Sequence, residues 1–142
     1  MIRIGPEDFD VAAELAALDG AGAVVSFTGH VRAEPGLIAL VLEHYPAMTE
    51  REIARHAGEA QARWPLTGLR IVHRVGRLLP GARIVFVGAA SSHRRAAFEA
   101  CEFLMDYLKV RAPFWKREER EDGARWVEAE ASDDAAAQRW NI

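Results

Sequence analysis

The sequence predicts an α+β fold in which helices pack on a largely antiparallel sheet. Two apolar segments with strand composition, 69–76 and 82–90, are separated only by "RLLPG", as in neighbouring antiparallel strands. Segments with helical spacing of apolar residues precede, separate and follow the strand patterns. No repeat, low-complexity linker or shift in composition divides the chain, so we expect one domain over residues 1–142.

Periodicity and boundary residues predict two helices in the first half of the chain. Apolar residues recur at helical spacing over 7–18, until "DGAG" ends the pattern. Thr49 and Glu52 have the spacing of a capping box, which predicts the start of a second helix. This helix should end near Trp64, because Pro65 cannot continue it.

The second half of the chain predicts one long helix and one short helix. Ser91 and Ser92 are suited to cap a helix that runs from about residue 93 to about residue 111. Pro113 forbids continuation, so "PFWK" should leave this helix as extended chain. A polar turn of helix over 132–140 closes the chain.

Five segments have the composition of strands. Residues 23–29 are bounded by glycines, and residues 37–45 form a second apolar run. The segments 69–76 and 82–90 plausibly form a hairpin, and a short strand is expected over 125–129.

The composition favours an ordinary cytoplasmic protein. Half of the 142 residues are hydrophobic, 27% are charged, and the net charge of −3 gives no global attraction to nucleic acid or to an anionic membrane. The longest apolar runs are far shorter than the roughly 20 residues that cross a bilayer, and the N-terminus has no apolar signal core. The single cysteine, Cys101, excludes an internal disulfide framework and a multi-cysteine metal site.

The segment "DYLKVRAPFWKREER" carries the strongest sign of chemistry. Residues 109–120 contain five basic and two acidic side chains, a local positive excess in a negative protein. Lys109 and Lys116 flank two large aromatic residues, Phe114 and Trp115, so both desolvation and mutual repulsion would lower a lysine pKa. A lysine that is neutral near pH 7 can act as a base or nucleophile. The alternative interpretation is a solvated helix end, where cations are favoured.

Two further segments are candidate anion sites. In "SSHRR", His93 and Arg94 stand in the first turn of the predicted helix, where free backbone N–H groups and a guanidinium suit a phosphate. A local surface cluster explains them equally well. In "FTGHVR", a glycine lets the chain turn before Arg32.

The remaining histidines and the cysteine suggest packing rather than chemistry. His73 lies inside a strand pattern and is interpreted as structural, and His56 is expected on a helix surface. The histidines lack the close spacing of metal ligands, so we expect no metal. Cys101 stands mid-helix among apolar residues, where a thiol is usually inert.

The length of the predicted third helix constrains these sites. His93 and Lys109 would lie about 24 Å apart along one unbroken helix, at about 1.5 Å per residue. One chain therefore cannot bring both residues to one small substrate. Either they serve unrelated sites, or a symmetric dimer places the helix start of one subunit beside the lysines of the other.

Five motifs together resemble a known family. They occur in the order "FTGHVR", "LEHYPAMTE", "HRVGRLLPG", "SSHRRAAFEA" and "MDYLKVRAPFWKRE". In this order they resemble the large, catalytic subunit family of molybdopterin synthases (MoaE-like), over about residues 22–140. The resemblance implies an α/β hammerhead-like core with a small additional β region.

The resemblance also implies a reaction and partners. Family members insert two sulfurs into cyclic pyranopterin monophosphate and so make the dithiolene of molybdopterin, without a cofactor. The sulfur arrives as a thiocarboxylate on the C-terminal Gly-Gly tail of a small ubiquitin-like subunit. Two large subunits form a central homodimer with one small subunit at each end, a heterotetramer whose pockets are shared between the large subunits.

Individual site residues follow from the same resemblance. Lys109 and Lys116 match the essential lysines of the family, and Lys109 is expected to be the principal catalytic amine. The resemblance gives Arg32, His93 and Arg94 the role of holding the pterin phosphate. The positions expected to contact substrate are His30, Val31, Arg32, His93, Arg94, Lys109, Lys116, Arg117 and Glu118.

Two other functions remain as alternatives. A noncatalytic module could use the same basic segment to bind a ubiquitin-like tail and an anionic ligand, and Lys109→Ala would then weaken partner binding as much as turnover. A persulfide sulfurtransferase could use Cys101, and Cys101→Ser would then abolish activity.

Overall fold

The computed structural model describes residues 1–20 and 22–141. Its strands form two four-stranded sheets, and only the pair β1–β4 is parallel. The predicted α+β class and the largely antiparallel pairing are confirmed. The elements are β1 (Ile2–Gly5), α1 (Val11–Ala16), β2 (Ala23–His30), β3 (Leu37–His44), α2 (Pro46–Arg63), β4 (Leu66–Arg74), β5 (Gly76–Leu78), β6 (Arg83–Ser91), α3 (Arg94–Val110), β7 (Phe114–Arg120), β8 (Gly123–Val127) and α4 (Ala131–Gln138).

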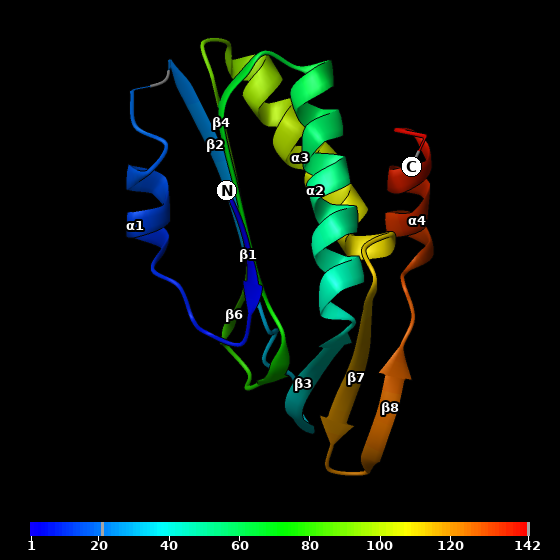
Figure 1. Ribbon diagram of the computed structural model, residues 1–142. Helices are drawn as coiled ribbons and strands as arrows, with labels where there is room; N and C mark the ends of the chain where they lie inside the picture. Colours follow the sequence, from blue (N-terminus) through cyan, green and yellow to red (C-terminus); the bar gives the residue numbers. More distant parts are fainter. Residues whose placement is uncertain (21, 142) are drawn as a thin grey trace.

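The first sheet has the strand order β1-β4-β6-β2, with helices on both faces. Figure 1 shows α1 on one side of this sheet and α2 and α3 on the other. The central strand β6 is buried from Val85 to Ser91, because both of its faces are covered. The predicted pairing of 69–76 with 82–90 is confirmed as β4–β6, although β5 interrupts the connection and joins the other sheet.

Helix α1 lies very close to the first sheet because that sheet has glycines beneath it. Leu18, just after the helix, is 4% exposed. A Cβ atom at Gly88 would lie 2.5 Å from Leu18 Cδ1, so a larger residue there would force the Leu18 side chain to move. The helix is shorter than the predicted 7–18, because the Asp10 side chain caps it by accepting a hydrogen bond from Ala12 N.

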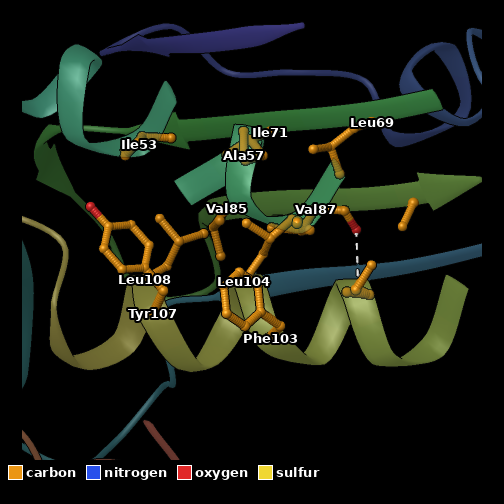
Figure 2. Close-up of a cluster of buried hydrophobic side chains, with 14 residues drawn as sticks. Ile53, Ala57, Leu69, Ile71, Val85, Val87, Phe103, Leu104, Tyr107 and Leu108 are labelled. Atoms are coloured by element: carbon orange, nitrogen blue, oxygen red, sulfur yellow. Dashed lines mark hydrogen bonds between the residues drawn. The ribbon is translucent and has the colours of Figure 1, made fainter. Parts of the chain in front are cut away.

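The main core lies between the first sheet and helices α2 and α3 (Figure 2). Ile53 of α2, Ile71 of β4 and Leu104 of α3 are fully buried in it. Figure 2 shows their side chains directed toward one another between the helices and the strands. Each such side chain contributes on the order of 2 kcal/mol to stability through burial. This core fixes α3, which carries several of the candidate site residues.

Two predictions about α2 are wrong, and the third is confirmed. The helix begins at Pro46 rather than at Thr49, because proline fits the first turn of a helix. Thr49 is buried one turn inside, where its hydroxyl donates to Tyr45 O over 2.9 Å. His56 was expected on the surface but is buried, with its ring stacked on Tyr107 at 3.5 Å. The helix ends at Arg63, as the proline at position 65 predicts.

The predicted serine caps of α3 are also wrong. The N-cap residue is His93, and its side chain makes no capping hydrogen bond. Ser91 instead joins two segments: its Oγ donates to Pro65 O over 2.8 Å and accepts from His93 N over 3.2 Å. The predicted span of α3 is confirmed to within a residue at each end.

The second sheet has the order β5-β3-β7-β8 and is entirely antiparallel. In Figure 1 it extends beyond the ends of the first-sheet strands, and α4 follows β8. The expected extended "PFWK" segment is the start of β7, which continues to Arg120. The expected strand over 125–129 begins two residues earlier as β8, and the last helix spans Ala131–Gln138.

The C-terminal segment packs against α3. Trp140 Nε1 donates to Asp106 Oδ2 over 2.6 Å, and Arg139 forms an ion pair with Glu102 at 2.8 Å. Among the described residues, no helix is both long and apolar enough to cross a membrane.

Candidate active site

A cavity of about 410 Å³ lies where the two sheets meet beside α3. Its walls come from β2, β3, β4, β6, α3 and β7, so elements far apart in the sequence contribute to it. The lining residues are Phe27, Thr28, Gly29, His30, Arg32, Leu40, Leu42, His73, Ile84, Val85, Met105, Asp106, Leu108, Lys109 and Lys116. We call this space the main cavity.

Both lysines of the chain line the main cavity. The sequence contains two lysines, Lys109 and Lys116. Lys109 stands in the last turn of α3, and Lys116 returns on β7 in register with Leu42 of β3. The turn at Pro113 reverses the chain between them, because proline cannot continue the helix. The fold therefore brings the two lysines of this segment to one cavity.

The lysines also line a second, smaller cavity of about 170 Å³. Its other walls come from the end of α3, from the start of β7 and from the segment that joins β8 to α4. Acidic side chains are prominent there: Glu128, Glu130 and Asp133 all line it. The two amines thus stand between a largely apolar cavity and one with a negative rim.

The two lysines have different electrostatic surroundings. Burial lowers the pKa of Lys116, and the positive charge of Lys109 lowers it further, while Asp133 acts in the opposite direction. Lys109 is about half exposed, and its Nζ lies 3.9 Å from Asp133 Oδ2. The lowered pKa makes Lys116 the better candidate for an amine that accepts a proton, and the exposure of Lys109 suits it to contact a ligand that enters from solvent.

The segment after β2 places two basic side chains on the main cavity. His30 and Arg32 both line it, while Val31 between them is buried against Leu42 and Leu78. The Val31 backbone is fixed on both sides, because its N–H donates to Ala82 O over 2.8 Å and its carbonyl accepts from Gly81 N over 2.7 Å. Val31 thus anchors the segment rather than lining the cavity.

Arg117 and Glu118 lie beside Lys116 on β7 but do not line the main cavity. Arg117 lies 3.9 Å from Glu119, and Glu118 accepts a hydrogen bond from Arg120 over 2.5 Å. Their charges are therefore already compensated by neighbours in the described part of the chain.

His93 and Arg94 stand at the other end of α3 and are exposed. Neither residue is among the described residues that line the main cavity or the smaller cavity. Seventeen helical residues separate the two ends of α3 by about 25 Å, at about 1.5 Å per residue. Within one chain, the structure does not bring this pair to the lysines.

The sequence interpretation missed several residues that the fold brings to the lysines. His73 of β4 lines the main cavity, and its ring stacks on Phe114 with centroids 4.0 Å apart. Burial lowers the pKa of His73 to about 4, and the charges of Lys116 and His44 act in the same direction. Asp133 reaches Lys109 from α4. No local sequence signal marks either contact, because each joins segments distant in the chain.

Cys101 does not line the main cavity. Its Sγ donates to Val87 O over 3.7 Å, and burial raises the pKa of the thiol to about 11. Such a thiol stays protonated at neutral pH and is a poor nucleophile. Its surroundings agree with the expected packing role.

An exposed apolar hollow of about 310 Å³ lies between the edge strand β2 and α3. Phe27 and Phe98 line it and are 44% and 60% exposed. Phe27 also lines the main cavity, so this surface adjoins the lysine site. Among the described residues, no group of three histidine, cysteine, aspartate or glutamate side chains is arranged to hold a metal ion.

Comparisons with known proteins all find similarity to one protein family. The sequence model of the family described as MoaE protein matches residues 4–111. The molybdopterin synthase catalytic subunit of Mesorhizobium japonicum is 60% identical over 98% of this chain and 92% of its own length.

Two solved structures have the same fold. The MoaE protein from Burkholderia ambifaria superimposes with a TM-score of 0.85 at 52% identity, over 100% of this chain and 98% of the other. The crystal structure of molybdopterin synthase from Staphylococcus aureus gives a TM-score of 0.80 at 34% identity, over 88% of this chain and 95% of the other.

Proposed function

Because this chain belongs to the MoaE protein family, we propose that it is the catalytic subunit of a molybdopterin synthase. It transfers sulfur from the C-terminal thiocarboxylate of a small ubiquitin-like subunit to cyclic pyranopterin monophosphate, and so forms the dithiolene of molybdopterin. One observation supports this function at the level of individual residues. The only two lysines of the chain, from α3 and β7, meet in one cavity beside His30 and Arg32.

The two lysines divide the chemical work in this proposal. Lys116 accepts a proton or stabilises the acyl group during sulfur transfer, since its lowered pKa favours the neutral amine. Lys109, which is half exposed and lies beside Asp133, holds the thiocarboxylate or the developing oxyanion. This division reverses the order expected from the sequence, in which Lys109 is the principal amine. The different burial of the two side chains supports the reversal.

Substrate binding uses cations from two chains. Arg32 on the main cavity binds the phosphate by charge-assisted hydrogen bonds, and His30 contributes a hydrogen bond beside it. His93 and Arg94 of a second large subunit complete the site, because the same residues of the first subunit lie about 25 Å away along α3. Arg117 and Glu118 do not contact the substrate in this proposal and instead support β7. Val31 anchors the segment after β2.

The quaternary structure follows from the exposed surfaces. The hollow between β2 and α3 presents Phe27 and Phe98 next to an unpaired strand edge, which is typical of a subunit interface. In the proposal this face joins two large subunits, and one small subunit binds at each end. A cytoplasmic location belongs to the same proposal, and a single buried cysteine suits a reducing compartment.

The deciding experiment measures conversion of cyclic pyranopterin monophosphate to molybdopterin with a thiocarboxylated small subunit. Wild type should form product, whereas Lys116→Ala and Lys109→Ala should each lose about a hundredfold or more in rate. Arg55→Ala is the matched control, since Arg55 is an exposed cation paired with Glu52 on α2. It should leave the rate unchanged.

Gel filtration of the same variants separates catalysis from binding. Both lysine variants should still form the complex with the small subunit. Equal loss of complex and of turnover in Lys109→Ala would support the noncatalytic module instead. No product from a well-formed wild-type complex would refute the synthase function.

A further inference from the structure

His73 occupies an unusual place for a histidine. It lies on β4, a central strand of the first sheet, between Ile4 of β1 and Val85 of β6. Its ring packs face to face on Phe114 of the second sheet, with centroids 4.0 Å apart and an interplanar angle of 16°. It is 5% exposed, so the sheets on both sides fix the ring in one orientation.

The hydrogen bond of His73 determines which ring nitrogen carries the proton. Nδ1 lies 2.8 Å from the carbonyl oxygen of Arg74. A carbonyl oxygen can only accept, so Nδ1 is the donor. The pKa of about 4 keeps the ring neutral at physiological pH, because burial opposes a second proton. Nε2 is therefore unprotonated and has a free lone pair.

The lone pair of Nε2 faces a ligand space. Among the described residues Nε2 has no hydrogen-bond partner, and it is not one of the enclosed unsatisfied polar atoms, which are His44 Nδ1 and Tyr107 OH. Nε2 therefore keeps some accessible surface, and His73 is one of the residues that line the main cavity. A buried acceptor that the protein itself leaves unused is ready for a donor on a ligand.

The surroundings of His73 indicate which part of a ligand it meets. Leu42, Ile84, Val85 and Leu108 give the main cavity apolar walls, and Val85 is the direct partner of His73 in the β4–β6 pair. The guanidinium of Arg32 is exposed and suits an anionic group at the opening. A flat heterocycle therefore fits against the apolar walls, where a phosphate would be desolvated at high cost.

We propose that His73 is a specificity-determining residue whose Nε2 accepts a hydrogen bond from a ring N–H or amino group of the substrate heterocycle. This inference rests on the proposed function, because it assigns the pterin end of that substrate to the inner wall. A neutral imidazole suits this place better than a carboxylate, whose negative charge would raise the pKa of Lys116 and oppose its neutral form. A site built around such an acceptor discriminates against heterocycles that lack the donor.

Two substitutions separate the acceptor from the rest of the histidine. His73→Asn keeps a donor near the position of Nδ1, which can still reach Arg74 O, but removes the acceptor at Nε2. His73→Gln places a carbonyl oxygen near the position of Nε2. Both variants lose the stacking on Phe114, so their comparison isolates the acceptor. Thermal unfolding of each variant verifies that it is folded.

The experiment measures binding of cyclic pyranopterin monophosphate to the full chain by calorimetry, together with KM and kcat in the sulfur-transfer assay. His73→Asn should weaken binding by about tenfold and raise KM in proportion, while His73→Gln should stay within about threefold of wild type. Equal affinity of the Asn variant and wild type would overturn the inference. So would equal loss in both variants.

A measurement on wild type keeps the inference testable if a variant does not fold. In protein with ¹⁵N-labelled histidine, the unprotonated Nε2 resonance of His73 should move upfield when the pterin saturates the site, since the nitrogen gains a hydrogen bond. An unchanged resonance in a saturated complex would refute the role of His73 and leave the proposed function intact. Wild type that binds no pterin would refute the proposed function and, with it, this inference.

Discussion

The carboxylate of Asp133 lies 3.9 Å from the ammonium of Lys109, and it faces the same small cavity as Lys116. A helix at the end of the chain thereby places a negative charge beside two amines that belong to α3 and β7. The protonation of Lys116 therefore depends on its burial and on the charges of Lys109 and Asp133.

Lys116 should titrate below the ordinary lysine value of 10.5, because it is partly buried and close to Lys109. Reductive methylation with ¹³C-formaldehyde followed by NMR can measure this directly, since the chain has only two lysines besides its amino terminus. Lys109→Ala should raise the pKa of Lys116 by removing the repulsion, whereas Lys109→Arg should not. A Lys116 pKa that is insensitive to residue 109 would contradict the coupling.

In wild type, kcat/KM should increase with pH as Lys116 loses its proton. In Asp133→Asn this increase should occur at lower pH. The carboxylate of Asp133 raises the pKa of Lys116, so its loss lets Lys116 become neutral at a lower pH. The pH profile of kcat/KM reports the change. Asp134→Asn is the matched control, because Asp134 is the next residue of the same helix and pairs with Arg111 at 2.7 Å instead. Equal shifts in both variants would indicate a general effect of α4.

Acidification should destabilise the protein through His73. The unfolded chain binds a proton on this histidine near pH 6.5, but the folded chain binds it only near pH 4. Stability is therefore complete above pH 6.5 and is lost as the pH falls from 6.5 to 4, by up to about 3 kcal/mol.

Urea unfolding at pH 7 and pH 5 can verify this loss, with His73→Gln as the comparison. The variant should lose much less stability between the two pH values. A smaller dependence should remain in it, because burial also lowers the pKa of His56. An identical loss of unfolding free energy in wild type and variant would show that groups other than His73 cause the destabilisation at low pH.

Subunit mixing should restore activity if each site uses two chains. Arg94→Ala and Lys116→Ala homodimers should each be inactive, because every site lacks one contribution. Random exchange of subunits makes half of the dimers mixed, and each mixed dimer has one intact site, so about a quarter of wild-type activity should return. Activity that stays at the level of the separate variants after verified exchange would place both residues in one chain.

Cys101→Ser should leave sulfur transfer unchanged. The thiol is buried with a pKa of about 11, and it does not reach the main cavity. The sulfur-transfer assay with the thiocarboxylated partner provides the measurement. Loss of turnover in a variant that unfolds at the wild-type temperature would favour a persulfide mechanism.

Sequence reasoning predicted the parts of this protein that depend on neighbouring residues. The ends of α2 and α3 follow from Pro65 and Pro113, and the two lysines are marked by their own aromatic neighbours. Strand β7 was anticipated only as an extended segment. Its sequence "FWKREER" is mostly charged, and it becomes a strand because β3 and β8 pair with it on both sides.

The rest depends on contacts between distant segments. Strand β1 has four residues, too few for a periodic pattern, and its parallel pairing with β4 stabilises it. His56 lies in a polar stretch of sequence, yet α3 brings Tyr107 against it. His73 and Asp133 join the site by the same kind of long-range packing, which no local pattern reveals.

The main cavity is bounded by both sheets, with Leu42 and Lys116 on one side and His73 and Val85 on the other. A molecule held there contacts both sheets at once. A ligand that binds in the main cavity therefore stabilises the folded arrangement of the two sheets. The catalytic subunit should be stiffest while it holds its substrate and most deformable once the product has left.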